Sequence, residues 1–275
     1  MSDEQENIIA DLGVLSEFDI VAERERRIAF LGNYLLQSGA KAYVLGISGG
    51  VDSLTAALLA QEAVRRLRGK GHEAEFIAVR LPYGVQADES DAQASLQVIE
   101  PDRVVTVNIK DAADAMMSEV SSAAADFFAS GRREFHHGNI KARERMIAQY
   151  AIAGASHGLV IGTDHAAEAL MGFFTKHGDG AADVVPLTGL NKRRVRALAA
   201  AMGAPAKLVY KVPTADLETD APLRPDEEAF GVTYEQIDDF LEGRSIPAAA
   251  HDRIVATYRR SQHKRSLPVT PAPKA

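Results

Sequence analysis

Hydrophobic positions fall into two kinds of stretch, which alternate along the chain. Four short apolar runs have the length of buried strands, at residues 42–47, 75–81, 103–107 and 159–161. Longer stretches with apolar residues at helical spacing, or rich in alanine and leucine, cover residues 18–37, 52–68, 89–98, 111–130, 140–157 and 192–201. Because strands alternate with helices, the pattern predicts an α/β fold with a mostly parallel sheet and helices on both faces. Ligands bind such sheets beyond the carboxyl ends of the strands.

Two segments carry helix and strand breakers in place of periodicity. Residues 204–228 contain four prolines and many acids, which predicts an irregular loop. Residues 266–275 contain three prolines and predict a flexible tail. We find no internal repeat, and interpret residues 1–275 as a single domain.

Composition excludes several classes of function. The chain has 275 residues and a formal net charge of −7, whereas a nucleic-acid binder needs a basic face. No run approaches the ~18 apolar residues of a membrane span. The acidic N-terminus lacks the basic-then-apolar order of a secretion signal, so we expect a cytoplasmic protein without a membrane partner. The absence of cysteine excludes disulfides, thiolate metal sites and a cysteine nucleophile.

The segment after the first predicted strand is rich in glycine and hydroxyl groups. It reads Gly46-Ile47-Ser48-Gly49-Gly50-Val51-Asp52-Ser53 and leads into an Ala/Leu-rich helix. Glycines let the backbone approach a ligand closely, and the N–H groups of a helix N-terminus attract phosphates. The serines add hydroxyl donors, and Asp52 can hold a divalent cation that bridges the phosphates. The alternative is a tight strand-to-helix turn with a serine cap.

Two common phosphate-binding motifs do not fit this segment. A Walker A loop needs a lysine after its last glycine, and none is present. A dinucleotide fingerprint needs Gly-x-Gly-x-x-Gly, but serine stands at positions 48 and 53. The segment instead resembles the PP-loop, Ser-Gly-Gly-x-Asp-Ser, of the N-type ATP pyrophosphatases. This resemblance implies that ATP is cleaved between its α and β phosphates.

Further blocks are similar to those of bacterial ammonia-dependent NAD synthetases, and together they span about residues 18–268. They comprise residues 81–86, 138–143, 162–168, 172–176, 178–180, Asp183, 213–217 and 263–265. The resemblance implies a Rossmann-like PP-loop fold of the adenine nucleotide alpha hydrolase type. It also implies conversion of deamido-NAD, ATP and ammonia into NAD, AMP and pyrophosphate through an adenylate, with Mg²⁺, in a homodimer whose sites lie at the subunit interface.

The resemblance assigns site residues position by position. Residues 46–53, with Ser48 acting in catalysis, are expected to hold the ATP phosphates, and Asp52 and Glu168 to bind Mg²⁺. Asp179, inside a Gly-Asp-Gly turn, is the candidate base for ammonia. Further contacts to ATP are expected from Arg80, Gln86, Thr163, Lys192 and Thr214. Contacts to deamido-NAD are expected from Arg143, Lys176, Asp183, His263 and Lys264.

Several charged side chains near these positions also have simpler structural explanations. Lys192, Arg193 and Arg194 begin a helix, where positive charge is unfavourable unless an anionic ligand joins it. His165 is interpreted as a core or cap histidine without chemistry, and His136–His137 as surface residues. Two departures from the family pattern bear on the deamido-NAD contacts. The tail lacks aromatic residues, and His177 stands where Phe or Tyr is expected.

The source of nitrogen follows from the absence of cysteine. A glutaminase that uses a cysteine cannot be part of this chain, and fewer than 50 residues precede the loop, so we expect free ammonia unless a separate glutaminase docks. A tRNA-modifying or sulfur-transferring PP-loop enzyme is disfavoured by the charge and the missing cysteine. A nucleotide sensor without catalysis would not need Glu168 and Lys176 beside the loop. We expect the segments 84–91 and 204–228 to order over bound substrates.

Overall fold

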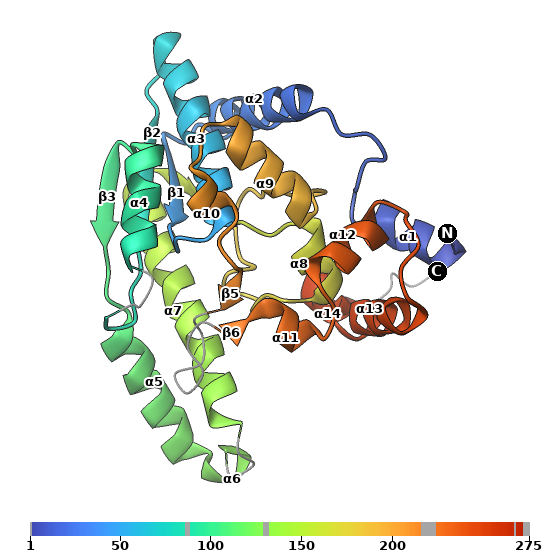
Figure 1. The fold of residues 1–275 in the computed structure, drawn as a ribbon. Helices are drawn as coiled ribbons and strands as arrows, with labels where there is room; N and C mark the ends of the chain where they lie inside the picture. The colour runs from blue at the N-terminus through green and yellow to red at the C-terminus, as the bar shows by residue number, and fades with distance from the viewer. Residues whose placement is uncertain (1, 86–88, 129–131, 216–223, 267, 272–275) are drawn as a thin grey trace.

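The computed structural model describes residues 2–85, 89–128, 132–215, 224–266 and 268–271 (Figure 1). Gln86, expected to contact ATP, therefore lies outside the described residues. Within these ranges no helix is long and apolar enough to cross a membrane.

A parallel four-stranded sheet forms the centre of the molecule, which confirms the predicted fold class. Its strands lie in the order β3-β2-β1-β4. Val44 of β1 pairs with Ile77 of β2 on one side and with Val160 of β4 on the other. The strands are β1 (Ala42–Gly46), β2 (Glu75–Arg80), β3 (Arg103–Thr106) and β4 (Gly158–Val160).

Helices cover both faces of this sheet (Figure 1). On one face, Tyr43 and Leu45 of β1 pack in a core built from α2 (Ile20–Ser38), α3 (Val51–Gly69), α4 (Glu89–Ile99) and α9 (Lys192–Ala201). On the other face, Val44 and Val160 belong to a core with Ile109 and Ala153. Ile109 directly precedes α5 (Lys110–Ala123), and Ala153 lies near the end of α7 (Arg133–Ala155). β1 and β2 are buried on both faces because they carry apolar residues almost without alternation, whereas the edge strand β3 is largely exposed.

A second hydrophobic cluster gathers the helices of the two chain ends. Ile8, Leu170, Phe240 and Ile254 belong to it. It joins α1 (Asp3–Asp11), α8 (Ala166–Met171), α11 (Asp226–Phe230), α12 (Tyr234–Leu241) and α13 (Ala248–Arg260), with the short α14 (Gln262–Arg265) following. Helices α1, α12 and α13 were not predicted from the sequence.

Two predicted segments differ from the structure. The helix expected at 111–130 ends at Ala123, where the backbone leaves helical geometry at Ala124, and a short α6 (Ala125–Phe128) follows. Residues 204–228 are more regular than expected, since they contain α10 (Ala206–Val209) and an antiparallel pair of β5 (Thr214–Ala215) and β6 (Arg224–Pro225).

Candidate functional site

The glycine-rich segment links the carboxyl end of β1 to the first turn of α3. Gly49 has φ +87°, and a Cβ there would lie 2.9 Å from the backbone nitrogen of Ala92, so only glycine fits. The Ser48 hydroxyl accepts from the Gly50 N–H at 3.2 Å and lies 3.1 Å from the Ser53 hydroxyl. Among the residues that the structure describes, no side chain caps the start of α3, which leaves its first N–H groups available to an anion.

A cleft of about 450 Å³ opens in front of this loop. Its walls come from segments that are far apart in the sequence, so the loop and the later blocks lie on the same space. The expected site residues that line it are Gly46, Ile47, Ser48, Gly50, Val51, Asp52, Ser53, Arg80, Thr163, Glu168, Asp179, Lys192 and Lys264. Arg145, Gln149, Phe173, Phe174, Lys211 and Asp226 also line it and were not predicted.

Asp52 and Glu168 face each other across one end of the cleft. One ligand atom from each of Asp52, His165 and Glu168 lies within 4.8 Å of the others. Asp52 Oδ2 accepts from Lys192 Nζ at 2.7 Å, while Asp52 Oδ1 is buried and has no hydrogen-bond partner in the described part of the chain. Mg²⁺ prefers carboxylate oxygens, so these two carboxylates fit such an ion.

The charges in this group depend on one another. Burial opposes ionisation of Asp52, but the Lys192 ammonium and His165 hold the pKa of this carboxyl well below its usual range. Burial, and then the charge of Asp52, raise the pKa of Glu168. The pair therefore carries less than its full negative charge until a cation joins it.

His165 is buried and stands at the N-cap of α8, as its interpretation as a core or cap histidine expected. Its Nε2 lies 3.4 Å from Asp52 Oδ1 and 3.6 Å from Glu168 Oε1, so it borders the carboxylate pair. The expectation that His137 is a surface residue was wrong, since it is buried and meets the Tyr83 ring edge-on, 5.6 Å between centroids. Nothing in the local sequence separates these histidines from ordinary core or surface ones.

The basic start of α9 is neutralised by the protein itself. Asp238 accepts from the backbone N–H groups of Lys192 and Arg193, at 3.0 and 2.8 Å. Arg193 also pairs with Glu242 at 2.6 Å, and Arg194 donates to the Leu15 carbonyl at 2.8 Å. An anionic ligand is therefore not needed to balance Arg193 and Arg194, and of the three only Lys192 lines the cleft.

Asp179 also lies in the cleft wall, where its charge adds to burial in raising the pKa values of Asp164 and Glu168. Asp179 Oδ1 accepts from the Thr175 N–H at 2.8 Å. The cleft walls remove water from this carboxylate and raise its pKa, although the residue keeps exposed surface. Lys264 Nζ lies nearby and donates to the carbonyls of Gly172 and Phe174, at 2.9 and 2.7 Å. A carboxylate and an ammonium thus lie near each other in the cleft wall.

Arg80 and Asp183 are held in place by the protein chain. Arg80 is 2% exposed, and its guanidinium donates to the Ile47 carbonyl and to Glu89. It therefore holds the backbone at the start of the loop in place. Asp183 Oδ2 accepts from the Val160 N–H at 2.7 Å, and this residue is not among those of the cleft wall. Thr214 lies in β5, and its side chain is outside the described part of the structure.

The remaining residues expected at deamido-NAD form a group beside the cleft. Arg143 Nη2 donates to the Lys176 carbonyl at 3.1 Å, and Lys176 Nζ donates to the carbonyls of His263 and Ser266. Arg143, Lys176 and His263 do not line the cleft formed by the described residues. The structure therefore brings these three together, but only Lys264 of this set faces the space in front of the loop.

The two segments expected to close over the site are linked. Lys211 Nζ lies 2.8 Å from Asp91 Oδ2, and Lys211 also lines the cleft. An ion pair of this kind couples the positions of the two segments. Their ordering on substrate binding stays a prediction.

Comparison with known proteins places the whole chain in one family. The sequence pattern described as "NAD synthase" matches residues 23–268. An NH(3)-dependent NAD(+) synthetase of Streptomyces coelicolor is 61% identical over 97% of both chains. The crystal structure of an NAD+ synthetase from Burkholderia pseudomallei superposes with a TM-score of 0.83 and 54% identity, covering 98% of this chain and 99% of that one. An NMN synthetase from Francisella tularensis gives a TM-score of 0.80 and 35% identity over 93% and 99%. The chain therefore belongs to the NAD synthase family.

Proposed function

We propose that this protein uses ATP and ammonia to convert deamido-NAD into NAD, with release of AMP and pyrophosphate. The observation that carries the proposal is one cleft in which a phosphate-binding loop, the Asp52–Glu168 carboxylate pair and Asp179 face the same space. The high identity to proteins named NH(3)-dependent NAD(+) synthetase supports the substrate assignment.

The first step activates a poor electrophile. An oxygen of the nicotinate carboxylate attacks the α-phosphorus of ATP, the bond to the β-phosphate oxygen breaks, and pyrophosphate leaves. The open N–H groups at the start of α3, the Ser48 and Ser53 hydroxyls and the Lys192 ammonium are placed to meet the negative charge of the leaving group. These donors are fixed before the substrate arrives, so no reorganisation is needed at the moment of reaction.

Asp52 and Glu168 are the residues that would hold Mg²⁺. When bound there, the ion neutralises phosphate charge and helps to orient pyrophosphate as a leaving group. A direct test is the Mg²⁺ dependence of Glu168→Gln, which should need about tenfold more Mg²⁺ for half-maximal rate. Asp239→Asn, which only loses surface pairs to Arg193 and Arg244, is the control. An unchanged Mg²⁺ requirement in Glu168→Gln would remove Glu168 from the metal site.

The second step forms the amide. Ammonia attacks the acyl carbon, the bond to the AMP oxygen breaks, and one proton of the nitrogen must leave. Asp179 is the group proposed to accept it, since it is a cleft carboxylate whose pKa is raised toward the working pH. Free ammonia is the proposed nitrogen donor because the chain contains no cysteine for glutamine hydrolysis.

We also propose a homodimer in the cytoplasm. Helices α5, α6 and α7 extend away from the sheet (Figure 1) and expose Met116, Phe127 and Ile147, by 48%, 74% and 53%. Phe135 is 46% exposed on the same arm and also lines the cleft, so a second copy packed there would reach the site. Sedimentation at micromolar concentration tests this, and a monomer would contradict it.

The function is tested by the stoichiometry of products. Purified protein with ATP, Mg²⁺, ammonium and deamido-NAD should form NAD, AMP and pyrophosphate in equal amounts. Release of ADP and phosphate would contradict the assignment of the loop. The mononucleotide that carries the same nicotinate carboxylate is the comparison substrate for the acceptor, because one similar structure is named NMN synthetase. A higher kcat/KM with that mononucleotide would replace the proposed acceptor, and activity with glutamine in place of ammonium would refute the nitrogen source.

A further inference from the structure

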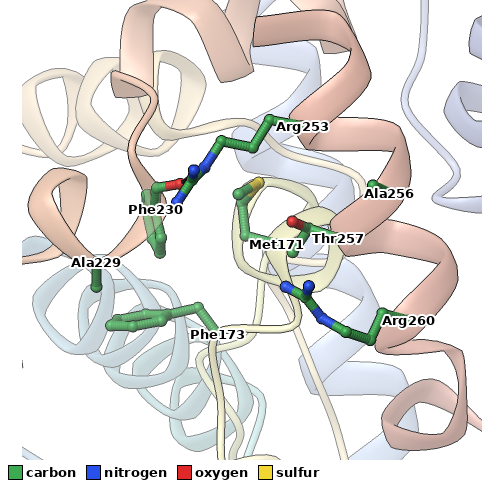
Figure 2. A pocket seen from close by; sticks show the side chains of 8 residues that line it. All are labelled: Met171, Phe173, Ala229, Phe230, Arg253, Ala256, Thr257 and Arg260. Atoms are coloured by element: carbon green, nitrogen blue, oxygen red, sulfur yellow. Dashed lines mark hydrogen bonds between the residues drawn. The ribbon is translucent and has the colours of Figure 1, made fainter. Parts of the chain in front are cut away.

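A second pocket lies behind one wall of the cleft, between α8, α11 and α13. It has a volume of about 300 Å³. Figure 2 shows its side chains, with the two arginines coming from one helix and the two phenylalanines from the segments opposite. The lining consists of Met171, Phe173, Ala229, Phe230, Arg253, Ala256, Thr257 and Arg260.

The pocket presents two cations, Arg253 and Arg260, that pair with no carboxylate within the described ranges of the chain. Arg253 Nε donates to the Phe230 carbonyl, and it pairs with no carboxylate among the described residues. Arg260 has no side-chain partner in the part of the chain that the structure describes. Its neighbour Arg259 points elsewhere and pairs with Glu4. Arg253, Thr257 and Arg260 have helical spacing, so all three project from one face of α13.

The opposite wall is aromatic. The rings of Phe173 and Phe230 meet edge to face, with centroids 4.6 Å apart and an angle of 87°. Met171 and two alanines complete the apolar lining. An inorganic anion would pair with the arginines but leave this apolar surface uncovered, whereas a ring that carries an anionic group satisfies both.

Size limits the ligand to a small molecule. A volume of about 300 Å³ is at the lower end for ligand pockets, enough for a single ring but too little for a dinucleotide. We propose that this pocket binds a small aromatic carboxylate, with the ring against Phe173 and Phe230 and the carboxylate on Arg260 and Arg253.

The pocket is connected to the cleft through shared residues. Phe173 and Ala229 line both spaces, so a ligand in the pocket touches the back of the cleft wall. The Phe173 N–H donates to the Glu168 carbonyl at 3.0 Å, which ties this wall to the helix that carries a proposed metal ligand. Occupation of the pocket therefore changes the affinity of the cleft for its substrates, and the coupling is reciprocal. The coupling between the pocket and the cleft rests on the proposed function, whereas binding of the aromatic carboxylate does not.

Binding is tested without any enzyme activity. The ¹⁹F signal of 3-fluorobenzoate should broaden and shift on titration with the full-length protein. Arg260→Gln should weaken its affinity about tenfold, the value for loss of one charge-assisted contact, while Arg259→Gln should leave it unchanged. Ala256→Leu fills part of the pocket without touching a charge and should also weaken binding. Benzamide, which lacks the charge, and phosphate, which lacks the ring, should each compete at least about tenfold less well than benzoate.

Competition distinguishes this pocket from the cleft. Saturating ATP and deamido-NAD should shift the affinity for 3-fluorobenzoate without displacing it, and benzoate should change the KM for deamido-NAD in wild type but not in Arg260→Gln. Full displacement by deamido-NAD, or equal binding by wild type and Arg260→Gln, would refute the pocket. Because the titration needs no turnover, it can succeed even if the proposed reaction is wrong.

Discussion

Lys192 Nζ lies 2.7 Å from Asp52 Oδ2, which joins the start of α9 to the start of α3 by a buried ion pair inside the cleft. Burial opposes the positive charge of Lys192, but Asp52 and Glu168 raise the pKa of this amine above its ordinary value. The pair thus holds a cation beside the loop and a carboxylate that is ionised. The Lys192 cation can stabilise the negative charge of the phosphates directly, and the ionised Asp52 carboxylate can do so through a bound metal ion.

Replacing this lysine should disable the first step. We expect Lys192→Met to lower kcat/KM for ATP by about 100-fold or more, because one fixed cation at the phosphates is lost. Arg193→Gln, the next residue, removes only pairs on the far side of α9 and should stay within about threefold of wild type. NAD formation under varied ATP measures both. Similar losses in the two variants would mean that α9 stability, not the cleft cation, matters.

Asp179→Asn should separate the two half-reactions. We expect exchange of labelled pyrophosphate into ATP to continue, while NAD formation falls by about 100-fold or more, since only the second step needs the base. In wild type, the base must be ionised and its pKa is raised, so the rate should fall on acidification at a higher pH than an ordinary carboxylate would give. Rates are compared at constant free ammonia. A normal rate of NAD formation in the variant would exclude Asp179 as the base.

The pH dependence of stability should reveal Asp164. Burial, then the charges of Asp179 and Asp52, raise the pKa of Asp164 to about 7. The folded state therefore holds this proton more tightly than the unfolded state, so the group makes stability fall as pH rises from about 4 to 7. Asp164→Asn should raise the free energy of unfolding by about 1–3 kcal/mol at pH 8 and have little effect at pH 3.

Denaturant unfolding at the two pH values measures this difference. Glu119→Gln, an exposed carboxylate on α5, is the control and should change stability little at either pH. A gain for Asp164→Asn of equal size at both pH values would show that its proton is not the cause.

Gly49→Ala should damage the loop through its backbone. The left-handed φ and the close Ala92 backbone leave no room for a Cβ, so we expect a loss of about 1–3 kcal/mol in stability and weaker ATP binding. Gly69→Ala, at the other end of α3, meets nothing within 4 Å and should be neutral or slightly stabilising. Thermal unfolding and ATP titration report both effects. Unaltered ATP affinity in Gly49→Ala would mean that this turn does not shape the phosphate site.

Local patterns in the sequence were sufficient to predict the sheet and the loop. β1 and α3 begin and end within one residue of the predicted strand and helix, because apolar runs and glycine stops act over short distances. The same reasoning could have found α12, whose Tyr234, Ile237 and Leu241 recur at helical spacing and are buried.

Relationships between distant residues were not predictable from spacing. Asp52 and His165 are separated by more than a hundred residues and meet only because β1 and β4 are neighbours in the sheet. The carboxylates that neutralise Arg193 come from α12 and from the residue that follows it, in a helical segment that was not foreseen. A single sequence shows which charges exist, but the fold decides which of them are already paired.

The Lys264 ammonium, bonded to the Gly172 and Phe174 carbonyls, also sets the order in which the site is completed during synthesis. The phosphate loop leaves the ribosome about two hundred residues before Lys264 does. A chain released after Glu168 but before Lys264 would contain the loop and both carboxylates, but the turn after α8 would have no ammonium to fix it.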